Sequence, residues 1–98
     1  MHDMRQLESA VGDALTAKGF APARFEGREG WDHIVQSGFR THIEGPDQIS
    51  VVWTPAYNVV VTPNERRDKR IAMADALASG GFDAETSAGS SEVRVRPR

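Results

Sequence analysis

The chain has 98 residues, which is enough for one domain (residues 1–98) around one hydrophobic core and too few for two such domains. Cysteine is absent, which excludes a disulfide scaffold and thiolate metal sites and favours a cytoplasmic protein. The formal net charge of −2 argues against a surface built as a whole for nucleic acid, and the apolar runs are too short for a signal peptide or a membrane span.

The first predicted element is a helix over residues 4–18. Apolar residues recur at helical spacing, and Asp3 is a suitable N-cap. Gly19 can take the left-handed conformation that ends a helix, after which Phe20 folds back over Leu15. This helix is predicted to pack its apolar stripe into the core.

The next part of the chain has the composition of β-strands. Residues 20–27 form a weak segment that contains Pro22 and suits the edge of a sheet. Residues 31–36 and 39–44 are predicted to form a hairpin around a two-residue turn at Ser37 and Gly38.

A further strand is predicted at residues 49–53, after a turn that contains Pro46. Consecutive strands imply an antiparallel meander. Residues 58–62 are predicted as a fourth strand, and the alternative is an extended lead into the next helix.

The second predicted helix has a well-defined start. Thr62, Pro63 and Glu65 match a capping box with proline at the first helical position. The helix is expected to end before Gly81, in the same way as the first helix ends at Gly19. A final hairpin over residues 82–98 follows, and its last strand alternates valine with arginine.

A repeat connects the two halves of the chain. The segment DALTAKGF at residues 13–20 matches DALASGGF at residues 75–82, and extended segments follow both. This pattern is typical of a duplicated helix-strand-strand unit. Any helix that ends in this type of glycine cap also favours these residues, so the sequence leaves both explanations open.

Taken together, the predicted elements indicate an α+β two-layer sandwich, with two helices packed on one face of an antiparallel sheet in the order α-β-β-β-(β)-α-β-β. Ten of the 12 cationic residues are arginine, and alanine and glycine are abundant. This bias is typical of a GC-rich coding sequence, as in an actinobacterium or one of its phages.

Positive charge is concentrated in the second part of the chain. Residues 1–62 carry five Lys or Arg and eight Asp or Glu, whereas residues 63–98 carry seven and six. An α-helix turns by about 100° per residue, which places Ile71 in the predicted buried line of the second helix, the stripe of side chains that faces the core. Arg67 and Arg70 lie on the same stripe, nearer the start of the helix. The predicted anion-binding or partner-binding residues are Arg66, Arg67, Lys69, Arg70, Arg94 and Arg96.

The segment ERRDKRIAMADAL, residues 65–77, is similar to the basic, alanine-rich second helix of double-stranded-RNA-binding domains. Residues 3–79 also share that family's order of a helix, three strands and a helix. The resemblance implies that the cations at the helix start would meet phosphates across a groove. The chain departs from the family in lacking its Gly-Pro-x-His loop between the first two strands, and Asp68 interrupts the basic cluster.

Two histidines raise the question of a metal site. If the chain turns at Ser37 and Gly38, His33 and His42 lie opposite each other on one face of the sheet. Arg40 is an unfavourable neighbour for a cation, and we predict no metal site. The chain also lacks the Gly-x-Ser-x-Gly, GxxxxGK and GxGxxG motifs, so we predict no catalytic residues, no cofactor and no enzyme.

The sheet face away from the helices combines aromatic, aliphatic and arginine residues, which suits a protein interface, and the alternative is a half-polar face in contact with solvent. We therefore predict a small non-enzymatic interaction domain that binds a protein partner or self-associates through this face or an edge strand. The alternative is binding to a nucleic-acid backbone. The residues predicted at the interface are Trp31, His33, Arg40 and His42.

Overall fold

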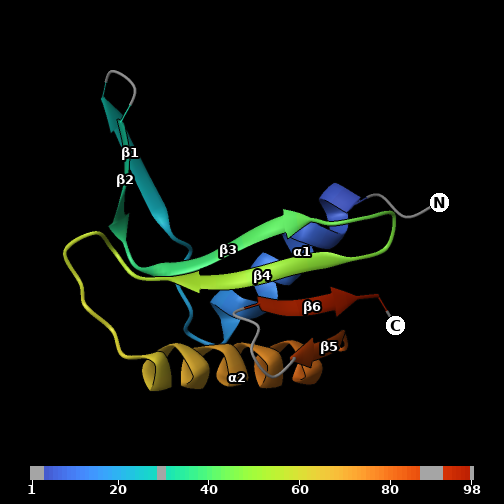
Figure 1. The fold of residues 1–98 in the computed structure, drawn as a ribbon. Helices are drawn as coiled ribbons and strands as arrows, with labels where there is room; N and C mark the ends of the chain where they lie inside the picture. The colour runs from blue at the N-terminus through green and yellow to red at the C-terminus, as the bar shows by residue number, and fades with distance from the viewer. Residues whose placement is uncertain (1–3, 29–30, 87–91, 98) are drawn as a thin grey trace.

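The structure, a computed structural model, describes residues 4–28, 31–86 and 92–97. Within them, two helices and six strands follow the order α-β-β-β-β-α-β-β, which confirms the predicted α+β class. Four strands form one antiparallel sheet in the order β3-β4-β6-β5, and β1 and β2 form a separate ribbon (Figure 1). The elements are α1 (Met4–Ala17), β1 (Arg24–Arg28), β2 (Trp31–Gln36), β3 (Gly38–Ile43), β4 (Ile49–Thr54), α2 (Pro63–Ser79), β5 (Asp83–Thr86) and β6 (Glu92–Arg96).

The caps of both helices follow the prediction where the structure describes them. Thr62 accepts a hydrogen bond from the backbone N–H of Glu65 at 3.1 Å and begins α2. Gly19 and Gly81 have φ of 91° and 94°, and in each case the N–H of the following Phe donates to the C=O of the last core Leu, at 3.0 and 3.1 Å. The predicted N-cap Asp3 lies outside the described residues.

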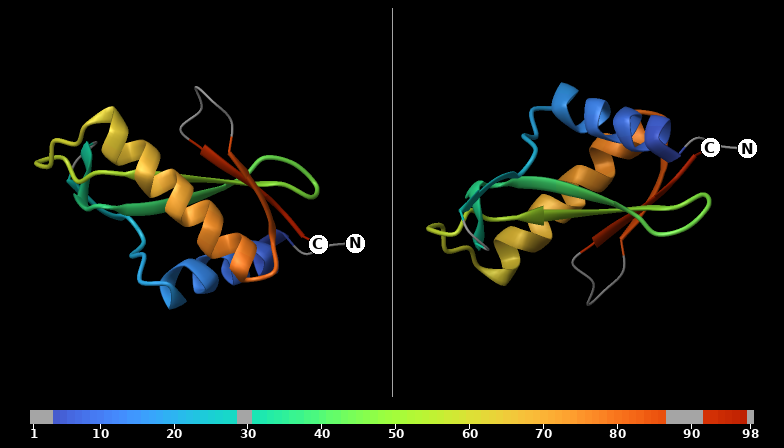
Figure 2. Two further views of the ribbon diagram at one scale, coloured as in Figure 1. Left: turned by 90° about the horizontal axis from the view of Figure 1, so that it is seen from below. Right: turned by 90° about the horizontal axis from the view of Figure 1, so that it is seen from above.

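The core lies between the four-stranded sheet and the two helices, which pack on the same face of the sheet (Figure 2). Alternation along each strand directs every second side chain to this face. Phe39, Ile49 and Val51 are buried there. The fully buried residues from the other elements are Val11, Leu15, Met73, Leu77, Val93 and Val95.

The rotation of α2 about its axis differs from the prediction. Met73 is fully buried, whereas Ile71 is 44% exposed and Ala78 is exposed. A Cβ on Gly80 would lie 3.3 Å from the Cβ of Ala14, so α2 packs against α1 as well as against the sheet. This contact between distant parts of the chain fixes the rotation of α2. The sequence does not determine the rotation, because apolar residues occur on most sides of the second half of the helix.

The predicted hairpin around Ser37 and Gly38 is wrong. β2 pairs with β1 and β3 pairs with β4, so the chain passes from the ribbon into the sheet at Ser37 (Figure 1). Gly38 instead allows two segments to cross closely, because a Cβ there would lie 2.2 Å from the C=O oxygen of Ala21. At this crossing Phe39 donates its N–H to Ala21 at 3.0 Å and accepts from the N–H of Ala23 at 2.9 Å.

The strand predicted at residues 58–62 is also wrong. These residues belong to the connection between β4 and α2, which was the alternative. The fourth strand before α2 is β1, which overlaps the segment predicted as a weak edge at residues 24–27. The β1–β2 ribbon projects beyond the end of the main sheet (Figure 1).

Candidate interaction surfaces

The six predicted binding cations lie on two separate surfaces. In β6, Val93 and Val95 are fully buried, so Arg94 and Arg96 lie on the outer face of the sheet, away from the helices. Residues 66–70 form the first turns of α2 on the opposite side of the sheet. The structure therefore does not bring the six cations together into one site.

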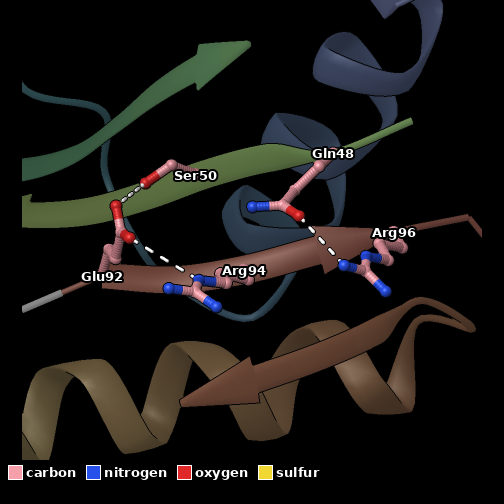
Figure 3. A network of polar contacts seen from close by, with 5 residues as sticks. All are labelled: Gln48, Ser50, Glu92, Arg94 and Arg96. Atoms are coloured by element: carbon pink, nitrogen blue, oxygen red, sulfur yellow. Dashed lines mark hydrogen bonds and ion pairs between the residues drawn. The ribbon is translucent and has the colours of Figure 1, made fainter. Parts of the chain in front are cut away.

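The cations of the outer face have partners within the chain (Figure 3). Glu92 accepts a hydrogen bond from Oγ of Ser50 at 2.5 Å, and its other carboxylate oxygen lies 3.7 Å from Nε of Arg94. Arg96 donates from Nη2 to Oε1 of Gln48 at 3.2 Å. Glu92 thus offsets the charge of Arg94, which lowers the attraction of this part of the outer face for an external anion, whereas the partner of Arg96 is a neutral amide.

The start of α2 is more open. Arg67 lies 3.9 Å from Asp68, and both side chains are more than half exposed, so this ion pair is weak. Lys69 lies over the ring of Trp53, with Nζ 5.6 Å from the centroid. Arg70 continues the buried line of α2, as predicted, and its buried Nε has no hydrogen-bond partner. Arg67 lies outside that line, because α2 is rotated.

The four predicted interface residues also belong to different parts of the molecule. Trp31 and His33 lie in β2 of the ribbon, whereas Arg40 and His42 are exposed in β3 of the main sheet. The predicted opposition of His33 and His42 is therefore wrong. Among the described residues no group of three potential ligands could hold a metal ion. The side chain of Trp31 lies outside the described part of the chain.

The largest exposed apolar side chains identify a surface that the sequence interpretation missed. We call residues 55–61, between β4 and α2, the apolar loop. Tyr57 is 72% exposed, Val60 96% and Val59 43%. The run of valines was interpreted as a strand, although turn-forming residues bound it at Pro55, Asn58 and Pro63 and leave it too short for a buried strand.

The apolar loop is fastened to the ribbon and to the start of β3. The N–H of Ala56 donates to Oγ of Ser37 at 2.7 Å, and the N–H of Tyr57 donates to the C=O of Ile34 at 2.9 Å. The ring of Tyr57 lies 5.4 Å from that of His33. These contacts hold the backbone at Ala56 and Tyr57, and the ring of Tyr57, in a defined position.

Phe25 in β1 is an exposed apolar side chain of the ribbon, 46% accessible. The guanidinium carbon of Arg40 lies 4.8 Å from the centroid of its ring. This cation–π contact, typically worth about 0.5–1 kcal/mol at an exposed site, connects the ribbon to the outer face of the sheet.

A shallow depression of about 370 Å³ lies between the ends of the two helices, lined by residues that include Lys18, Phe20 and Asp75. None of the candidate residues borders it. No helix among the described residues is long and apolar enough to cross a membrane.

The pairing of the strands also bears on the resemblance to double-stranded-RNA-binding domains. The three-stranded meander on which that resemblance depended does not form, because β2 belongs to the ribbon. Comparison of the chain with protein-family models, with curated proteins and with solved structures finds no match.

Proposed function

We propose that this protein is a non-enzymatic interaction domain that binds a protein partner through the apolar loop. The observation that supports the proposal best is the exposure of Tyr57 and Val60 on a loop that is held in place by hydrogen bonds. Binding would remove their apolar surface from water, which stabilises a complex by roughly 25 cal/mol per Å² buried.

The attachment of the loop supports the same proposal. An interface gains affinity when its contact residues are ordered before binding, because less conformational entropy is lost. The bond from Tyr57 to Ile34 and the ring contact with His33 limit the freedom of the loop in this way. Exposed tyrosine is also a residue type that dominates the energy of many interfaces.

The test is affinity capture from extracts of the native host with the full chain as bait. We expect wild type to retain a set of proteins that the double variant Tyr57→Ser with Val60→Ser loses. Ile71→Gln is the matched control, because Ile71 is also an exposed apolar residue but lies on α2. Retention of the same proteins by the double variant would contradict the proposal.

The start of α2 supports a second candidate function, binding to a nucleic-acid backbone. Residues 65–70 contain four cations and two acids, and the buried Nε of Arg70 is a donor without a hydrogen-bond partner. Cations at this position could neutralise phosphates. The outer-face pair Arg94 and Arg96 would not contribute, because it lies on the other side of the sheet.

Fluorescence anisotropy with labelled duplexes over a salt series tests this second function. Arg66→Glu with Arg67→Glu changes two exposed cations and should abolish a binding that weakens steeply with salt. Arg94→Gln with Arg96→Gln serves as the control and should leave it unchanged. Equal affinity in the first variant and in wild type would rule this function out.

A further inference from the structure

The open edge of β3 carries a second inference, which does not depend on the apolar loop. We propose that two copies of this chain associate through this edge, with their β3 strands antiparallel about a two-fold axis at His42. The two sheets would then form one continuous sheet with all helices on the same face.

The backbone of β3 offers unpaired groups along this edge. Phe39 directs its N–H and C=O outward to Ala21 and Ala23. Alternate residues of a strand direct these groups to the same side, so Thr41 and Ile43 present theirs to the open edge. Among the described residues, no strand pairs with this edge beyond the point where the ribbon leaves the sheet (Figure 1).

The two ends of the open edge define its length. At one end residues 21–23 already occupy the position beside Phe39. At the other end the chain turns away, where the N–H of Glu44 donates to the C=O of Gln48 at 3.0 Å. Residues 40–44 are therefore the part of the edge that is open to a second strand.

An axis at His42 makes this short edge complementary to itself. Thr41 faces Ile43 of the second copy, and the two residues can exchange both backbone hydrogen bonds. On the inner face the contact covers Ile43, which is 39% exposed in the single chain. On the outer face Arg40 stands opposite Glu44 of the second copy, and the two-fold axis makes this ion pair twice.

Neighbouring registers fit less well. An axis at Thr41 would place Ile43 of the second copy beside Phe39, where residues 21–23 already lie. An axis at Ile43 would pair Thr41 with Gly45, which lies two residues beyond the end of β3 and one residue beyond Glu44, where the chain already turns away. The same short edge thus selects one register and its charge pairing.

The other edge of the sheet is not complementary to itself. β5 carries Asp83 and Glu85, both exposed and on the same outer face because Ala84 between them faces inward. Two antiparallel copies of β5 would bring carboxylates opposite one another, and like charges across a strand pair are destabilising. Charged side chains of this kind protect edge strands from association.

Sedimentation equilibrium of the full chain across the micromolar range tests the proposal by charge reversal. Arg40→Glu and Glu44→Arg should each raise the dimer Kd roughly tenfold, since both ion pairs become like-charge contacts. The double variant exchanges the two charges and should recover the wild-type Kd. A monomer at high micromolar concentration, equal Kd values in the single variants, or no recovery in the double variant would overturn the proposal.

Two controls keep the outcomes separate. Arg94→Glu changes a charge on the same outer face away from the edge and should leave the Kd unchanged. The apolar-loop variant Tyr57→Ser with Val60→Ser should also dimerise normally, so loss of partner binding and loss of dimerisation are independent results. Growth beyond a dimer would contradict the two-fold model. It would indicate that β3 of one copy pairs with β5 of the next, an arrangement that leaves an edge free at each end for further copies.

Discussion

At Gly38 two segments of backbone approach so closely that a single methyl group decides whether the crossing can form. A Cβ would lie 2.2 Å from the O of Ala21 and 2.6 Å from the N of Ala23, and neither is the end of a flexible side chain. We expect Gly38→Ala to lower the free energy of unfolding by about 3 kcal/mol, because the backbone must move apart.

Urea unfolding followed by circular dichroism measures this effect. Gly45→Ala is the matched control, since a Cβ at that position meets no atom within 4 Å. Its free energy of unfolding should stay within about 0.5 kcal/mol of wild type. Equal stability of the two variants would show that the segments do not cross as described.

At the scale of the elements, the local sequence is sufficient to predict an end of a helix that depends on the chemistry of neighbouring residues. Thr62 begins α2 and Gly19 ends α1, because a cap bonds to backbone groups only a few residues away. Strand partners depend on distant contacts. The crossing at Gly38 could not be inferred from neighbouring residues, and the sequence was interpreted as a turn.

The same distinction between local and distant determinants applies to the candidate surfaces. The cations at the start of α2 were found because charge is visible in the sequence, although their grouping with β6 did not survive the placement of the strands. The apolar loop was missed because Val59 and Val60 have the composition of a strand. Their exposure depends on the chain passing outside the sheet after β4, which only the topology determines.

The rotation of α2 gives a prediction at the scale of the element. Met73 is fully buried and Ile71 is 44% exposed, the reverse of what an Ile71-centred stripe requires. Met73→Ala should cost about 3 kcal/mol of stability through the cavity it leaves. Ile71→Ala should cost less than about 1 kcal/mol, since alanine has the higher helix propensity. The opposite ranking in thermal or urea unfolding would contradict the observed rotation.

At the scale of the whole molecule, the two halves of the chain have matching arrangements. Each contributes a helix with a glycine cap and an antiparallel hairpin, and the second strands of the hairpins, β4 and β6, lie side by side at the centre of the sheet. The ribbon interrupts this pattern in the first half only, between α1 and β3. We interpret the match as support for the duplicated unit, with the ribbon as an insertion.

This interpretation predicts that the sheet and helices fold without the ribbon. The core cluster contains no ribbon residue, and Ala23 and Gly38 are already adjacent where the ribbon leaves the sheet. Replacing residues 24–36 with a short Gly-Ser linker should therefore retain the helical circular dichroism and a cooperative transition. The loss should be about 2 kcal/mol, from the cation–π contact of Arg40 and the hydrogen bond of Tyr57.

The same variant separates the two proposed interactions. Without Ile34 and His33 the apolar loop loses the two contacts of Tyr57 and keeps the bond from Ala56 to Ser37, so partner capture should fall even though Tyr57 and Val60 are unchanged. The open edge of β3 retains residues 40–44 and the flanking segment 21–23, so dimerisation should persist. An unfolded variant would show that the ribbon is part of the folding unit, and undiminished capture would show that the loop needs no support from it.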